Sequence, residues 1–157
     1  MNPTAGVLRP LADPLEPIRR GLAGLILMAT VVVNAGFGVF TNRIIQAGTA
    51  PKNIGWGTGA GTAAAGDTTL FTEKLVDLST SAGTDHTVGT ESRTTTTQTN
   101  DTYTVTGTRT ATGAGTVTNA GLFDAASGGT LTVKGDFTGI GLASGDSIAF
   151  TFNVKFA

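Results

Sequence analysis

The chain has 157 residues, with 10 basic and 11 acidic side chains, a net charge of −1, one histidine and no cysteine. A charged fraction of 13% without a basic excess argues against a nucleic-acid partner and against a polybasic membrane-surface protein. The lack of cysteine excludes disulfides, thiolate metal sites and cysteine nucleophiles, but it suits an oxidising and a reducing compartment equally. Threonine (30 residues) and glycine (23 residues) are abundant, which favours strands and turns over long helices. The length fits one domain.

Residues 1–20 contain four of the five prolines, at a spacing that leaves no room for a complete helical turn. The stretch has no apolar periodicity of its own. We therefore expect an extended arm that is either disordered or ordered on a neighbouring subunit. The candidate interface residues in and next to this arm are Pro10, Pro14, Pro17, Arg19, Arg20 and Leu25.

Residues 21–50 form a second segment, which begins with the apolar run Gly21–Val33. Thirteen residues are too few for a spanning helix, which needs about 20. The run resembles a secretory signal in its small-x-small site, but its basic pair follows an acidic and proline-rich stretch. We favour a retained, buried segment, with a signal or anchor as the alternative. A helix is expected to continue through Gln46 and to end at Gly48.

Residues 51–157 carry the two-residue alternation of β-strands. In Ser147–Phe156 all the large apolar residues fall on one face, so that face is expected to be buried. Thr102–Thr110 alternates in the same way, and its threonine face suits a solvated or intersubunit surface. Further expected strands are Asn53–Trp56, Leu70–Leu78, Val88–Gln98, Thr116–Phe123 and Thr130–Phe137. About seven short strands predict an all-β fold, an antiparallel, jelly-roll-like β-sandwich preceded by the arm and a short helix.

Residues 79–100 are almost entirely polar and include four consecutive threonines, Thr94–Thr97. Two interpretations stay open for them. We favour a long hairpin whose tip projects from the sandwich, and a mobile loop is the alternative.

No pattern in the sequence indicates chemistry. The glycine-rich run Gly55–Gly61 lacks the lysine and the following helix of a phosphate-binding loop, so we interpret it as a permissive turn. His86 is interpreted as a solvated loop histidine, because no activated nucleophile is apparent near it. Most aspartates lie beside turn residues and are expected to cap turns, with a calcium site as the alternative. These are Asp67, Asp101, Asp124, Asp136 and Asp146. We therefore predict no catalytic residue, cofactor or bound metal.

Trp56 is the only tryptophan and lies between glycines. Two roles are open for such a side chain, an anchor in the core or a residue that fills a partner's pocket. We favour the core, and we keep Trp56 among the candidate interface residues as the alternative.

Several short motifs follow one another in an order typical of one group of proteins. They are Ile54-Gly55-Trp56-Gly57-Thr58-Gly59, Asp67-Thr68-Thr69-Leu70, Glu73, Ala120-Gly121-Leu122-Phe123-Asp124-Ala125 and Gly128-Gly129. Their order resembles small virion structural proteins of tailed double-stranded DNA bacteriophages, over roughly residues 31–157. The resemblance implies a non-enzymatic β-sandwich component of the particle. It brings no catalytic residues with it.

The resemblance leads to one principal expectation and two alternatives. We expect a capsid decoration or cement protein on the virion surface, whose arm binds the major capsid protein and which associates with copies of itself, as a trimer or another symmetric oligomer. A tail fibre, baseplate or other tail-associated protein is the first alternative. A secreted carbohydrate-binding module is the second. The principal expectation includes no membrane association and no small-molecule substrate.

Overall fold

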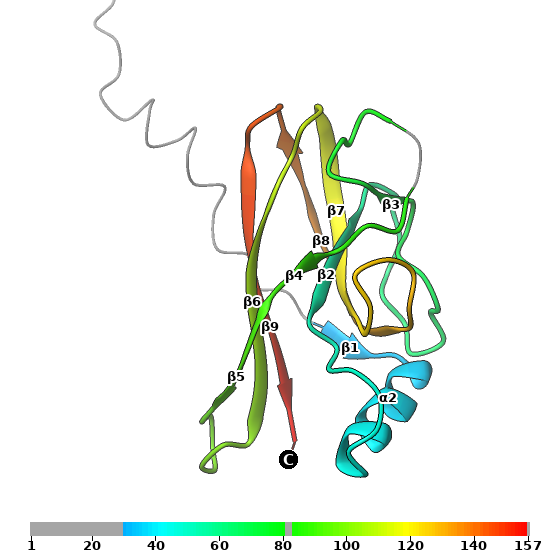
Figure 1. The fold of residues 1–157 in the computed structure, drawn as a ribbon. Coiled ribbons are helices and arrows are strands. Elements are labelled where there is room, and N and C mark those ends of the chain that lie inside the picture. The colour runs from blue at the N-terminus through cyan, green and yellow to red at the C-terminus, as the bar shows by residue number, and fades with distance from the viewer. Residues whose placement is uncertain (1–29, 81–82, 157) are drawn as a thin grey trace, which may run out of the picture.

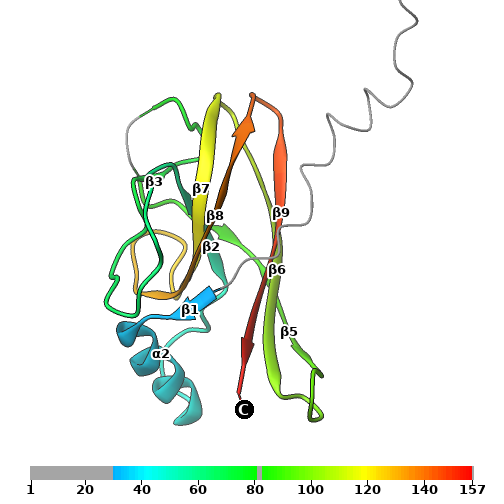
Figure 2. The same ribbon diagram turned by 180° about the vertical axis from the view of Figure 1, so that it is seen from behind.

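Two antiparallel sheets form the body of the protein in the computed structural model, which describes residues 30–80 and 83–156. The sheets pack face to face as a sandwich (Figures 1 and 2). Every pairing between the named strands is antiparallel. The predicted antiparallel β-sandwich is therefore confirmed.

The larger sheet has six strands and the smaller sheet has three. The larger sheet has the order β1 (Thr30–Val32), β8 (Leu131–Leu142), β7 (Gly115–Phe123), β2 (Asn53–Gly57) and β3 (Glu73–Lys74), with β4 (Thr87–Val88) also paired to β2. The smaller sheet has the order β5 (Thr90–Thr94), β6 (Thr102–Thr110) and β9 (Ser147–Lys155). The chain crosses between the sheets twice at the upper end of Figure 1, from β6 to β7 and from β8 to β9.

The core lies between the facing sides of the two sheets. Strand β9 shows the predicted alternation most clearly, because its even-numbered residues are buried and its odd-numbered residues face outward or are half-buried. Residues of β2, β7 and β8 meet them from the larger sheet. The buried apolar cluster includes Ile54, Trp56, Val105, Val117, Leu122, Val133, Ile148, Phe150 and Phe152.

The threonine face of β6 is solvated over only part of its length. Thr106 and Thr108 are exposed, as expected, whereas Thr102 and Thr104 are buried. The hydroxyl of Thr104 donates to Asn153 Oδ1 on β9 at 2.9 Å and pairs with the hydroxyl of Thr94 on β5. The polar face near the hairpin tip therefore binds neighbouring strands instead of water.

The expected N-terminal helix is shorter than the sequence pattern indicates. Helix α2 runs from Asn34 to Ile44, and the residues before it form strand β1, which pairs with β8. Residues 30–32 are β-branched, and an open edge of the larger sheet is available to them, so pairing prevails over helix formation. Residues 21–29 lie outside the described residues. In the described part of the chain, no helix is long and apolar enough to cross a membrane.

Two further predictions are corrected in part. Within the expected strand Leu70–Leu78, only Glu73 and Lys74 form a strand, β3. The other residues belong to a loop. The polar region 79–100 supplies only one arm of a hairpin, β5; the other arm is β6, which follows the region, and the tip is held by the Asp101 carboxylate. The residues before Thr87 form a separate loop rather than a hairpin arm.

The glycine-rich run after Ile54 is not a turn at its start. Gly55 and Gly57 lie within β2, and neither has a positive φ. Gly55 is needed for close packing, because a Cβ atom there would lie 2.8 Å from the Phe123 ring and 2.9 Å from the His86 ring. The glycine therefore makes room for two neighbouring rings.

Candidate functional site

Three buried ionisable side chains contact the loops that pack against the strands. His86 is the first of them. Its side chain is buried and its ring stacks on Phe123 with centroids 3.9 Å apart. Nδ1 lies 2.8 Å from the carbonyl oxygen of Ala125, and Nε2 lies 2.7 Å from Glu73 Oε1. Both ring nitrogens of His86 therefore face oxygen atoms of distant parts of the chain. The prediction of a solvated histidine is wrong, because its partners come from distant parts of the chain.

Arg109 is the second buried group, and sequence reasoning missed it. Its guanidinium lies 4.9 Å from the centroid of the Trp56 ring. It donates to three backbone oxygens and one hydroxyl, namely those of Ile54 (3.1 Å), Asp85 (2.5 Å), Lys74 (3.4 Å) and Thr87 (3.2 Å). Burial lowers the pKa of Arg109 to about 10, and the charges of Asp85 and Glu73 oppose this shift. The arginine thus joins β2 to the loops on either side of it.

Lys134 is the third buried group, and it fastens the loop that follows β2. Its Nζ donates to Asp67 Oδ2 at 2.8 Å and to the Thr69 carbonyl oxygen at 2.9 Å, and it lies 3.1 Å from the centroid of the Phe71 ring. The hydrogen bond from Lys134 is the main cause of the lowered pKa of Asp67. All three buried groups therefore hold loops in place through internal contacts.

The aspartates mostly act as predicted. Asp101 accepts from the backbone N–H groups of Thr96, Thr97 and Gln98, and these bonds, led by Gln98, hold its pKa well below its usual range. Three others accept from a backbone N–H close in sequence, namely Asp67, Asp124 and Asp146. Asp136 differs, because it accepts from Ala63 in a distant loop.

A calcium site is the alternative role for these aspartates. The described residues contain no group of three or more histidine, cysteine, aspartate or glutamate side chains placed to hold a metal ion.

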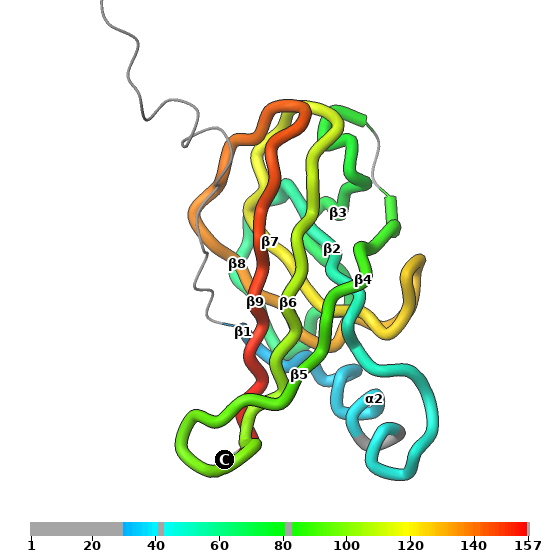
Figure 3. The backbone as a smooth tube through the Cα atoms, turned by 60° about the vertical axis from the view of Figure 1, so that its left-hand side comes forward, coloured from blue at the N-terminus to red at the C-terminus, as the bar shows by residue number. Residues whose placement is uncertain are grey.

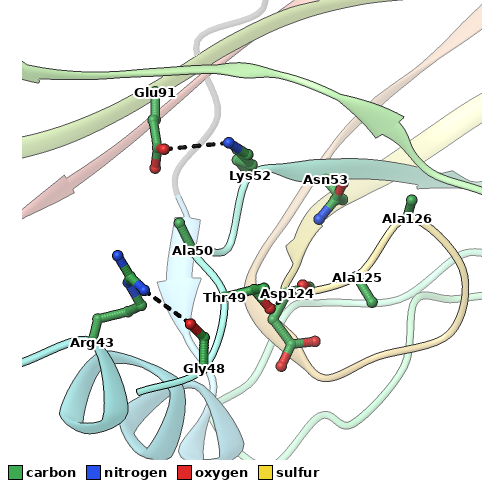
Figure 4. A pocket seen from close by; sticks show the side chains of 10 residues that line it. All are labelled: Arg43, Gly48, Thr49, Ala50, Lys52, Asn53, Glu91, Asp124, Ala125 and Ala126. Carbon is green, nitrogen blue, oxygen red and sulfur yellow. Dashed lines mark hydrogen bonds and ion pairs between the residues drawn. The ribbon is translucent and has the colours of Figure 1, made fainter. Parts of the chain in front are cut away.

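A hollow of about 500 Å³ lies between the loop after α2, β5 and the loop after β7 (Figure 4). Its charged side chains already have partners. Arg43 donates to the Gly48 carbonyl oxygen at 2.9 Å, and Lys52 forms an ion pair with Glu91 at 3.4 Å. The hollow is wide and mixed in charge, with no unpartnered polar group converging on a common point, so its geometry does not indicate a ligand.

Several exposed apolar side chains lie close together where α2 meets the end of β9. Phe37 is 60% exposed, Ile44 is 81% exposed and Phe156 is 56% exposed. A groove of about 340 Å³ runs between them, and we call it the α2/β9 groove; it is lined by Val32, Phe37, Phe40, Ile44, Val154, Lys155 and Phe156. The Phe40 ring meets the Phe156 ring edge-on at 5.8 Å. An apolar surface of this kind is typical of a protein-binding site.

The candidate interface residues have different outcomes. Trp56 is fully buried, and its Nε1 donates to the Leu75 carbonyl oxygen at 2.8 Å, so the core role holds and the side chain offers no surface to a partner. The other six, Pro10, Pro14, Pro17, Arg19, Arg20 and Leu25, lie outside the described residues.

The burial of Arg109 and Lys134 was not predicted from the sequence. For Arg109, one feature of the sequence pattern indicated it. Arg109 is in phase with Val105 on β6, on the face that the alternation assigns to the core. For Lys134 no such signal exists, because β8 is buried on both faces from Leu131 to Gly135.

Comparison of the chain with protein-family models, with curated proteins and with solved structures found no match.

Proposed function

We propose that this chain is a non-enzymatic structural protein of a tailed bacteriophage particle, a decoration or cement protein that binds the major capsid protein and stabilises the shell. The observation that carries an assembly role is the exposed apolar surface at the α2/β9 groove. It adjoins β1, the strand to which the N-terminal arm is joined. The arm and this surface together provide contacts beyond one face of the sandwich, and stable interfaces need at least about 1,000 Å².

The phage assignment rests on the resemblance described above, and the spatial arrangement of its motifs supports it. The first motif forms most of β2, and the Ala120–Phe123 motif forms the end of β7. These two strands pair in register, with Ile54 opposite Leu122 and Trp56 opposite Ala120. Segments almost 70 residues apart thus form one packed unit, as expected if their order in the sequence reflects a shared fold.

The contacts of the ionisable groups also favour a role in assembly over catalysis. His86, Arg109 and Lys134 are engaged with backbone carbonyls or carboxylates of their own chain. The burial of each side chain is therefore explained by the loops that it stabilises, and no substrate is needed to account for it.

Deletion of residues 1–20 tests the proposal. We expect the truncated chain to keep its circular dichroism spectrum and melting temperature and to lose binding to particles stripped of this protein, measured by co-sedimentation. Binding that is unchanged by the truncation would contradict the proposed role of the arm. Electron microscopy of labelled particles locates the chain, and label on the tail would favour the tail-associated alternative.

A matched pair of substitutions tests the groove. Ile44→Ser removes an exposed apolar side chain from the groove, and Val88→Ser removes one of 61% exposure from β4. Both changes are expected to alter the free energy of unfolding by no more than about 0.5 kcal/mol, because both side chains are exposed. We expect Ile44→Ser alone to weaken particle binding, by about tenfold. Equal effects of the two variants would contradict a specific role for the groove.

A further inference from the structure

Strand β9 has a long edge without a partner in the described residues. It pairs with β6 on one side only, over nine residues. Figure 3 shows β9 along one margin of the smaller sheet, with β5 along the other. An unpaired edge of this length presents a row of free N–H and C=O groups and is a template for a further strand.

The other sheet edges are protected in ways that β9 is not. Strand β5 is short and fully exposed, and it carries Glu91 and Arg93. The edge strands β1 and β3 of the larger sheet have only three and two residues. Charge and short length discourage pairing. Strand β9 has one charged residue, Lys155, at its very end.

The chain before Thr30 is well placed to reach this edge. Strand β1 contacts β9, and Val32 and Val154 line the same groove. Strands β8 and β9 run in opposite directions in Figure 1, and β1 is antiparallel to β8. The direction from Val32 back to Thr30 therefore points toward the Leu142 end of β8, from which the chain enters β9. A chain that continues in this direction beside β9 would approach Ser147.

The composition of the sequence before Thr30 suits a strand that pairs with an open sheet edge. Residues 22–29 contain no proline, no charge and five large apolar side chains, Leu22, Leu25, Ile26, Leu27 and Met28. A run without proline or charge can use every backbone N–H in pairing with a strand edge and buries no charge there. We propose that residues 22–29 add to the free edge of β9 in the same chain, as a further, parallel strand of the smaller sheet.

The register follows from the common rise of β-strands, about 3.3 Å per residue. Val32 and Val154 line the same groove, and a register that places them side by side would put Leu27 beside Ala149, five residues earlier in each segment. The added strand would thus join the two sheets at Thr30 and release residues 1–21 at the Ser147 end of β9. This inference is independent of the proposed function, because the strand can form whether or not the arm binds a capsid.

Cysteine pairs test the proposal cleanly, because the chain has no cysteine of its own. Ala149→Cys, at an exposed position, is combined in turn with Ile26→Cys, Leu27→Cys and Met28→Cys, to cover neighbouring registers. Neighbouring strands bring Cα atoms within the range of about 4.4–6.8 Å that a disulfide spans. The control combines Leu27→Cys with Ser92→Cys on β5, at the opposite edge of the sheet.

After mild oxidation of the full chain, we expect most of the monomer to carry an intramolecular disulfide in at least one Ala149→Cys pair and none in the control, by non-reducing gel and intact mass. Disulfides in no pair, or only between two chains, would overturn the proposal, and the second result would assign the edge to a second copy. Hydrogen exchange of the unmodified full chain gives an independent readout. The β9 amides that do not bond to β6 are expected to be protected, and Leu27→Pro is expected to remove that protection. Rapid exchange of these amides in the unmodified chain would also overturn the proposal.

Discussion

The loop-covered side of the larger sheet and the end of the molecule at the α2/β9 groove satisfy their side chains in opposite ways. On the loop-covered side and at the β3/β4 edge beside it, buried cations bind oxygen atoms of their own chain, as Lys134 and Arg109 show, although Arg109 Nε has no partner. At the groove, large apolar side chains such as Ile44 and Phe156 remain exposed. The first region is held together by contacts within the chain, whereas the second gains free energy by being covered. Substitutions are therefore expected to affect stability in the first region and binding in the second.

The largest effect on stability is expected from Arg109→Met. The substitution keeps an unbranched apolar stem but leaves the carbonyl oxygens of Ile54, Asp85 and Lys74 without their donor. Each unsatisfied buried group costs about 1–3 kcal/mol, so we expect a loss of at least about 3 kcal/mol in the free energy of unfolding, measured by urea denaturation. Arg93→Met on the exposed strand β5 is the control, with an expected change within about 0.5 kcal/mol. Similar losses in both variants would contradict the contrast.

Lys134→Met is expected to cost about 2–3 kcal/mol at neutral pH, because it leaves the Thr69 carbonyl oxygen and Asp67 without their donor. The loss also depends on pH in a defined direction. The pKa of Asp67 is lower in the folded state than the ordinary value of 3.8, so its contribution is present above that value and is lost as the pH falls through the folded pKa.

The stability difference between wild type and Lys134→Met should therefore be constant from pH 7 to pH 5 and shrink below about pH 4. Denaturation curves of both proteins across this range measure it. A difference that grows toward acid pH would show that the Asp67 contact does not carry the effect.

Two glycine substitutions give the smallest effects and opposite signs. Gly55→Ala places a Cβ atom against the Phe123 and His86 rings and is expected to cost about 1–3 kcal/mol. Gly38→Ala, in α2, meets nothing within 4 Å and is expected to stabilise the protein by about 0.5–1 kcal/mol, because alanine favours the helix. The melting temperatures of the two variants, measured by thermal unfolding, compare a tightly packed position with an open one. Destabilisation by Gly38→Ala would show that the surface of α2 is already covered.

The sequence pattern predicted the positions of several strands closely. Thr102–Thr110 has the predicted bounds, and the expected strands ending at Trp56 and Phe123 differ from the observed ones by one residue at one end. Local turn chemistry was also predictable, as the Asp101 and Asp146 caps show. The environments of His86 and Trp56 were not predictable in this way. The partners of His86 come from residues 13 and 39 positions away, and no local pattern records such contacts.

By itself, the sequence determined an antiparallel sandwich with a helix before it, because alternation, β-branching and glycine content act over a few residues at a time. Only the tertiary structure decided that Trp56 lies in the core, that Arg109 and Lys134 fasten loops, and that no other strand of the described residues pairs with the outer edge of β9. Burial and strand pairing depend on which distant segments meet in space. That outcome is a property of the whole packed chain and not of any one segment.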